Sequence, residues 1–66
     1  MYPNLEAEMK RKGITALSMA EGMEMAPSTL SAKMNKKNRI RLQECVRIID
    51  TYFPGMSIEY LFAWAD

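Results

Sequence analysis

Apolar residues recur at helical spacing along the chain, in short segments that are separated by helix-breaking residues. Leu5 and Met9 are four residues apart, so they share one face of a helix. Pro3 suits the first turn of that helix, and Gly13 suits the position just after its end. No stretch alternates β-branched with polar residues, as a half-buried strand would. The pattern therefore predicts an all-α chain.

Four more short helices follow from the same reasoning. Thr15 can cap a second helix, and a third runs from about Pro27 to Met34. A fourth begins after Ile40, and Ser57 can cap a fifth behind the Pro54-Gly55 break. The residues expected to face the core in this part of the chain are Leu17, Met19, Ala20, Met23, Leu30, Met34, Ile40, Leu42, Cys45, Val46, Ile49, Phe53, Ile58, Leu61 and Phe62.

Length and composition narrow the classes of function. The 66 residues make one small domain, residues 1–66, which buries only about 60% of the surface of its unfolded chain. There is no His and one Cys, so the commonest general base, the commonest metal ligand and an internal disulfide are excluded. No apolar run approaches the length of a membrane span, and the N-terminal residues do not resemble a signal peptide. We expect a cytoplasmic protein with no cofactor, metal, membrane or small-molecule ligand.

Charge is distributed unevenly although the net charge is only +1. Residues 33–47 carry six basic residues and one acid, Glu44, which gives this segment a charge of +5, whereas both flanks are acidic. A basic segment within a neutral protein is typical of a polyanion-binding surface, but solvated surface lysines give the same pattern. The basic residues are Lys33, Lys36, Lys37, Arg39, Arg41 and Arg47.

Residues 15–35 form the most informative segment. Two short helices are joined here by a tight turn, with the small residue Ala20 where they cross and Met25 at the corner. Leu30 anchors the second helix to the core. The opposite face of this second helix carries small or polar side chains, which suit close approach to base edges and phosphates. That face consists of Ser28, Thr29, Ala32 and Lys33.

These features resemble the phage Cro/repressor-type (XRE-type) helix-turn-helix domains over nearly the whole chain. The resemblance is carried by Met-Tyr-Pro-Asn-Leu at 1–5, Lys-Gly-Ile-Thr at 12–15, Met19-Ala20, Ser-Thr-Leu-Ser at 28–31, Met-Asn-Lys-Lys at 34–37, Phe53-Pro54 and Ser-Ile-Glu-Tyr-Leu-Phe at 57–62. It implies a compact five-helix, lambda-repressor-like fold with its helix-turn-helix at about 15–35. It also implies a phage- or mobile-element-derived transcriptional regulator that binds double-stranded DNA.

The resemblance assigns roles to particular residues. The third helix would enter the major groove, with Ser28, Thr29, Ala32 and Lys33 toward bases or phosphates. The basic loop, residues 36–41, would lie on the DNA backbone. Its contact residues would be Lys36, Lys37, Asn38 and Arg39.

Three positions depart from the family pattern. Ala16 stands where members usually have a phosphate-binding Gln, and Glu24 stands where the turn usually has a Gly at positive φ. Gly22 lies two residues earlier, inside the helix, where Gly costs about 1 kcal/mol relative to Ala. These departures keep an alternative open, namely a protein-interaction or antitoxin-like module of the same fold with weak or no DNA binding.

Other reactive residues have simpler explanations. Met19, Met23 and Met25 resemble a copper(I) thioether cluster, but the helix-turn-helix needs all three as packing residues. Cys45 lies among apolar neighbours, as a buried thiol would. The serine and threonine hydroxyls have no His base, so we do not expect an enzyme.

Tyr60 and Trp64 are four residues apart and would share an outer face of the last helix. An exposed aromatic pair is a candidate interface, and operator-binding domains of this type pair around a two-fold axis. We therefore expect a homodimer through Tyr60 and Trp64. The alternative is that Trp64 folds back onto Tyr2 or Phe53 and completes the core.

Overall fold

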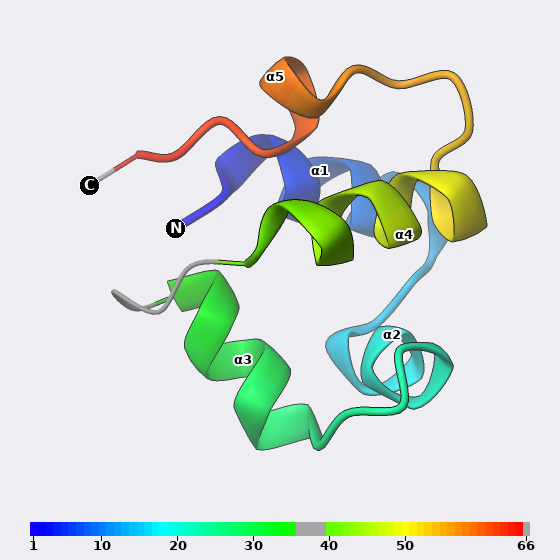
Figure 1. Ribbon diagram of the computed structural model, residues 1–66, viewed down its shortest axis with the longest axis vertical. Helices are drawn as coiled ribbons and strands as arrows, with labels where there is room; N and C mark the ends of the chain where they lie inside the picture. Colours follow the sequence, from blue (N-terminus) through cyan, green and yellow to red (C-terminus); the bar gives the residue numbers. More distant parts are fainter. Residues whose placement is uncertain (36–39, 66) are drawn as a thin grey trace.

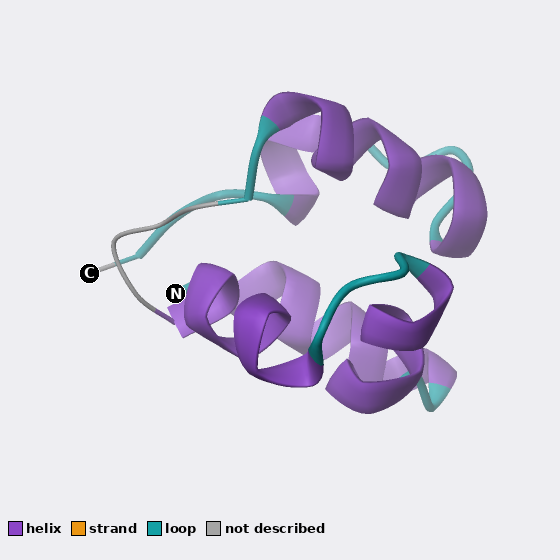
Figure 2. Cartoon of the chain, turned by 60° about the horizontal axis from the view of Figure 1, so that its bottom comes forward, coloured by secondary structure: helices purple, strands orange, loops and turns teal. Residues whose placement is uncertain are grey.

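The computed structural model describes residues 1–35 and 40–65. Within these residues the chain forms five α-helices, joined by loops and turns, and no strand (Figures 1 and 2). The predicted all-α class is thus confirmed. None of these helices is long and apolar enough to cross a membrane. The helices are α1 (Pro3–Lys12), α2 (Ala16–Gly22), α3 (Pro27–Asn35), α4 (Leu42–Tyr52) and α5 (Ile58–Leu61).

The helix ends follow from local sequence. Pro3 occupies the first turn of α1, and Gly13 ends that helix in the left-handed conformation, with φ of 70°. At the start of α2, the Thr15 side chain accepts from the Ser18 N–H at 3.0 Å, while the Ser18 hydroxyl accepts from the Thr15 N–H at 3.1 Å. Ser57 caps α5 by accepting from the Tyr60 N–H at 3.1 Å. These caps satisfy N–H groups that a helix leaves unpaired at its start.

One apolar core joins all five helices. Figure 1 shows α2 and α3 as a pair below α1, α4 and α5, and the Cα radius of gyration is 10.6 Å. The side chains of Leu5, Met19 and Ala20 are fully buried, as their spacing predicted. The other buried apolar residues are Tyr2, Met9, Met23, Leu30, Met34, Ile40, Cys45, Ile48, Ile49, Phe53 and Leu61.

Three residues that were expected in the core are exposed instead. Leu17, Leu42 and Val46 have exposed fractions of 56%, 67% and 42%. On α4 the buried side is set by Cys45, Ile48 and Ile49, so Leu42 and Val46 lie on the edge of the helix. Ile48, which the sequence analysis left out, is fully buried.

A close approach explains Gly22. A Cβ atom at this position would collide with the hydroxyl of Tyr52, the last residue of α4. Gly22 therefore lets the end of α2 pack under an aromatic ring of α4. Gly lowers the stability of a helix, and at this position the contact with Tyr52 offsets that cost.

The two ends of the described chain lie side by side (Figures 1 and 2). The Met1 nitrogen donates to the Ala65 carbonyl, and the Ala65 N–H donates back to the Met1 carbonyl, both at 3.0 Å. Between them, the Tyr2 ring packs edge-on against Phe62 and Trp64. We call these two contacting segments, residues 1–2 and 62–65, the terminal clamp.

Candidate nucleic-acid interface

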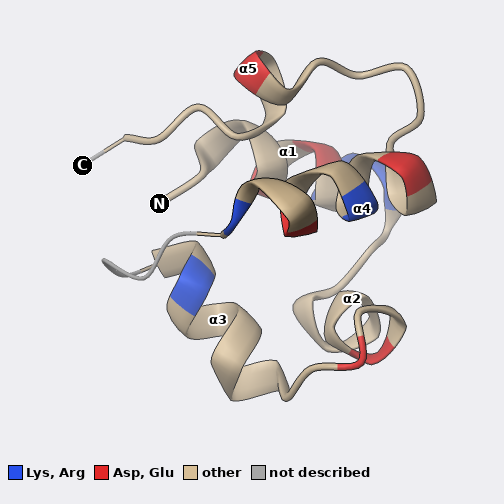
Figure 3. Cartoon of the chain, in the orientation of Figure 1, with Lys and Arg blue, Asp and Glu red and all other residues tan. Residues whose placement is uncertain are grey.

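Helix α3 presents an outer face of small side chains. Leu30 and Met34 point into the core, which leaves Ser28, Thr29 and Ser31 exposed and Ala32 partly exposed. We call Ser28, Thr29, Ser31 and Ala32 the α3 outer face. Figure 3 shows that α3 carries almost no charge along its length. The structure thus places the three uncharged residues of the expected base-reading set, Ser28, Thr29 and Ala32, on one accessible helix.

Lys33 is positioned differently from the expectation. Its ammonium group lies 2.9 and 2.7 Å from the two carboxylate oxygens of Glu44 on α4. Both side chains are only about one-fifth exposed, at 20% and 21%. Lys33 therefore neutralises Glu44 and ties α3 to α4, rather than offering a free charge to a phosphate.

Glu44 also holds the entrance of α4. Its Oε1 atom accepts from the Arg41 N–H at 3.0 Å, as an acidic residue in the first helical turn commonly does. Burial by itself would raise the pKa of the Glu44 carboxyl. The carboxylate accepts hydrogen bonds from the Lys33 ammonium and from the Arg41 N–H, and it lies near the positive charges of the Lys33 and Arg41 side chains. Together these interactions outweigh burial and leave the pKa of Glu44 below its ordinary value.

The basic loop is only partly described by the structure. Lys36, Lys37, Asn38 and Arg39 lie outside the described residues. The end of the loop is defined, since Ile40 is buried and Arg41 is exposed. Arg41 has an extended backbone, with φ of −72° and ψ of 155°, at the residue that precedes α4.

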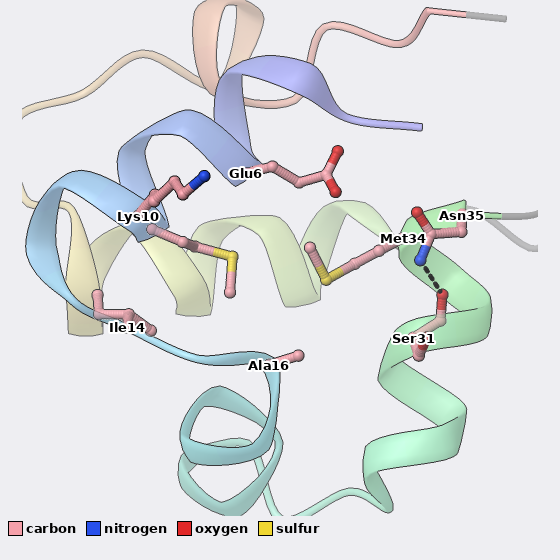
Figure 4. Close-up of a pocket in the computed structure, with 8 residues that line it drawn as sticks. Glu6, Lys10, Ile14, Ala16, Ser31, Met34 and Asn35 are labelled. Atoms are coloured by element: carbon pink, nitrogen blue, oxygen red, sulfur yellow. Dashed lines mark hydrogen bonds between the residues drawn. The ribbon is translucent and has the colours of Figure 1, made fainter.

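A groove of about 370 Å³ runs between α1 and α3 (Figure 4). Met9, Ile14 and Met34 supply its apolar lining, and Glu6 and Lys10 come from α1. Ala16, Ser31 and Asn35 complete it, and the Asn35 amide donates to the Ser31 carbonyl at 3.1 Å. We call this the α1–α3 groove.

The α1–α3 groove adds two polar residues that the sequence analysis did not assign to the site. These residues are Lys10, which lies in the last turn of α1 where a cation interacts favourably with the helix dipole, and Asn35, the last residue of α3. Asn35 could have been found by spacing, because it lies seven residues after Ser28 and four after Ser31 on the same helix. Lys10 comes from a different helix, so no local spacing joins it to α3.

The turn between α2 and α3 is acidic and strained. Glu24 adopts a positive φ of 57°, so this position has the left-handed conformation for which the family pattern places a Gly. Its carboxylate lies 3.6 Å from the Arg47 guanidinium, and both side chains are largely exposed. Figure 3 shows acidic residues gathered at the end of α2 and in this turn, beside the start of α3.

The expected aromatic pair is not brought together. Helix α5 ends at Leu61, so Tyr60 and Trp64 do not share a helical face. Trp64 is partly buried, with its ring 4.9 Å from that of Tyr2, as the folded-back alternative required. Tyr60 is 45% exposed and donates to Glu8 Oε2 at 2.8 Å.

The Glu8–Tyr60 contact was not foreseen, because a glutamate in the middle of a surface helix is normally solvated. Glu8 is only 3% exposed, and Arg11 lies 3.7 Å from its second oxygen. The hydrogen bond to Glu8, together with partial burial and the nearby negative charge, raises the pKa of the Tyr60 phenol. This pair joins α1 to α5 on the side of the terminal clamp.

Sulfur-containing residues serve in packing. Met19 and Met23 are buried, and Met25 packs against the core from the turn, which confirms the packing interpretation. Burial, and then the adjacent Glu44 charge, raise the pKa of the buried Cys45 thiol, so the thiol stays protonated at neutral pH. Within residues 1–35 and 40–65, no three His, Cys, Asp or Glu side chains gather as metal ligands would.

Comparison with protein-family models, curated proteins and solved structures gave no match to this chain. The function is therefore inferred from the chemistry and geometry of the chain itself.

Proposed function

We propose that the protein is a sequence-specific, double-stranded-DNA-binding transcriptional regulator with a lambda-repressor-like fold, in which α2, the turn and α3 act as a helix-turn-helix. The observation that carries the proposal is the α3 outer face, an uncharged and accessible helical surface beside the basic loop. An α-helix with its side chains is about 10–12 Å across, which fits a major groove about 12 Å wide, and the nine-residue α3 carries mostly small side chains on its accessible face. The resemblance of the sequence to phage repressors supports the same reading.

The α3 outer face has the chemistry of base readout. Ser and Thr hydroxyls both donate and accept hydrogen bonds, and a Thr or Ala methyl group can contact the methyl group of thymine. Ser28 and Thr29 lie in the first turn of α3, at the end of the helix that usually contacts bases. We assign base contacts to Ser28, Thr29 and Ala32.

Contacts to the DNA backbone are assigned to basic and amide side chains that the structure leaves accessible or does not describe. Most of these contacts to the DNA backbone come from the basic loop, through Lys36, Lys37, Asn38, Arg39 and Arg41. Lys10 and Asn35 extend the contact surface into the α1–α3 groove on the other side of α3. Lys33 is omitted, because its charge is held by Glu44.

Fluorescence anisotropy with labelled duplexes from the genetic neighbourhood, titrated across salt, tests this proposal. One duplex should bind more tightly than the others, and the affinity should fall steeply with salt because phosphate contacts release counterions. The Lys36/Lys37/Arg39→Glu variant should bind none of the duplexes. The Ser28→Ala/Thr29→Ala variant should lose discrimination between duplexes and keep the salt dependence of the wild type.

The acidic turn favours a second candidate function, a protein-interaction module of the same fold. Glu21 and Glu24 are both exposed beside α3, and their charge opposes approach to DNA. If every duplex binds weakly and equally at low salt, and charge reversal in the basic loop changes nothing, the DNA-binding proposal fails and this second function is favoured.

A further inference from the structure

A buried hydrogen bond joins the first residues of the chain to the end of the basic loop. The Ile40 N–H donates to the Tyr2 hydroxyl oxygen at 3.1 Å, and the exposed fractions of the two residues are 7% and 3%. The next N–H along the chain, that of Arg41, donates to Glu44 at 3.0 Å. Two successive backbone N–H groups are therefore held by two different side chains, Tyr2 from the start of the chain and Glu44 from the first turn of α4.

Both acceptors are themselves fixed in place. The Tyr2 ring lies edge-on between Phe62 and Trp64, with centroid distances of 5.7 and 4.9 Å. The Glu44 carboxylate is held by Lys33 through both of its oxygens. Rings and carboxylates that are packed and paired in this way have few alternative rotamers, so they define the direction of the backbone at residues 40–41.

Arg41 is the residue that this arrangement presents. Its side chain is exposed and its backbone is extended, so the side chain leaves the chain before α4 begins. A guanidinium binds a phosphate through two parallel hydrogen bonds, and this contact is sensitive to orientation. A backbone that is held at both the Ile40 and the Arg41 nitrogen reduces the entropy lost when such a contact forms.

We propose that Tyr2 is a positioning residue for DNA-backbone binding, which acts by fixing residues 40–41 so that the Arg41 guanidinium reaches a phosphate. The proposal rests on the DNA-binding function proposed above. It makes the terminal clamp responsible for orienting Arg41, one of the backbone contacts assigned there. It also explains why a tyrosine hydroxyl is buried at the second residue of the chain, where a phenylalanine would fill the same space.

A double-mutant cycle in full-length protein tests this coupling. Tyr2→Phe keeps the ring packed against Phe62 and Trp64 and removes the acceptor of the Ile40 N–H. Tyr2→Phe and Arg41→Ala should each weaken binding to the preferred duplex by about three- to tenfold, the size expected for one hydrogen-bonded contact. The double variant should bind no more weakly than Arg41→Ala alone, because Tyr2 acts through Arg41.

Salt dependence separates positioning from a general loss of stability. Arg41→Ala should lower the slope of log affinity against log salt by about one, the value for one lost phosphate contact, and Tyr2→Phe should lower it by up to the same amount. Amide hydrogen exchange at Ile40 should speed up in Tyr2→Phe without DNA. Binding is measured at a temperature at which circular dichroism shows every variant to be folded.

Tyr60→Phe is the matched control. It makes the same chemical change in the same region and removes the donor to Glu8 instead. It should lower the melting temperature and leave duplex affinity and salt slope unchanged, because Tyr60 does not contact residues 40–41 through that hydroxyl.

The outcomes distinguish the two proposals. If the wild type shows no salt-dependent duplex binding, the DNA-binding function fails, and the role of Tyr2 fails with it. If the wild type binds but the losses from Tyr2→Phe and Arg41→Ala add in the double variant, the positioning role alone is overturned. The same holds if Tyr60→Phe weakens binding as much as Tyr2→Phe does.

Discussion

Within residues 1–35 and 40–65, Glu24 is the only residue other than glycine that adopts a positive φ. A non-glycine residue in the left-handed region costs about 1–2 kcal/mol, and Glu24 has φ of 57°. Its ion pair with Arg47 joins two exposed side chains at 3.6 Å, so it offsets little of this cost. The same residue adds negative charge beside the proposed DNA face.

Replacing Glu24 with Gly should therefore stabilise the protein. We expect Glu24→Gly to raise the free energy of unfolding by about 1 kcal/mol, and the melting temperature by about 4–8 °C for a chain of this size. Glu24→Gln is the control, because it removes the charge and keeps the strain, so it should melt near the wild type. A melting temperature for Glu24→Gly at or below that of the wild type would contradict this interpretation of the turn.

At the scale of elements, the Lys33–Glu44 pair is the main polar link between α3 and α4. Since the pKa of Glu44 lies below its ordinary value of 4.5 in the folded protein, the ionised carboxylate favours the folded state. That contribution is complete above about pH 4.5, and it is lost as the pH falls through the lowered pKa.

Glu44→Gln should flatten the acid limb of the stability profile. Chemical denaturation at pH 7 and at pH 3 measures the loss of stability on acidification, which should be smaller in Glu44→Gln than in the wild type. Glu59→Gln changes an exposed carboxylate of α5 and serves as the control, which should follow the wild type. Equal acid losses in all three proteins would show that Glu44 does not link α3 and α4 in this way.

The elements were predictable where a single face decides burial. Leu5 with Met9, and Leu30 with Met34, followed from four-residue spacing, because α1 and α3 each bury one narrow stripe. Helix α4 is apolar over a wider arc. Periodicity could not decide which edge of that arc packs inward, so Val46 was chosen and Ile48 was missed.

The last helix was the least predictable element. Residues 57–64 have apolar spacing for two helical turns, and extending α5 to Trp64 made an outer aromatic pair. The structure ends α5 at Leu61 because the following residues form the terminal clamp with Met1 and Tyr2. A contact across more than 60 residues of sequence leaves no trace in local periodicity.

At the scale of the whole molecule, Trp64 belongs to the terminal clamp, where its ring packs against Tyr2, whereas the sequence had suggested a dimer contact. Trp64→Ala should lower the free energy of unfolding by about 2 kcal/mol, since it removes a half-buried ring and its edge-on contact with Tyr2. Sedimentation should be unchanged. A dissociation into smaller species on this substitution would instead assign Trp64 to an interface between copies.

The candidate site was predictable as far as it lies on one helix. Ser28, Thr29 and Ala32 follow from the face of α3 that Leu30 and Met34 leave free. The ion pair of Lys33, the α1–α3 groove and the Tyr2–Ile40 bond each depend on residues from two separate elements. Such contacts are fixed by tertiary packing, so neither charge counts nor spacing could place them.

Amide chemical-shift mapping of the ¹⁵N-labelled protein with its preferred duplex tests the central claim most directly. The largest perturbations should fall on Ser28, Thr29 and Ala32 and on residues 36–41, with smaller ones at Lys10 and Asn35. The exposed residues of α5 should be unaffected. Perturbations that leave the α3 outer face unchanged, or that centre on α5, would contradict the account and place the binding surface elsewhere.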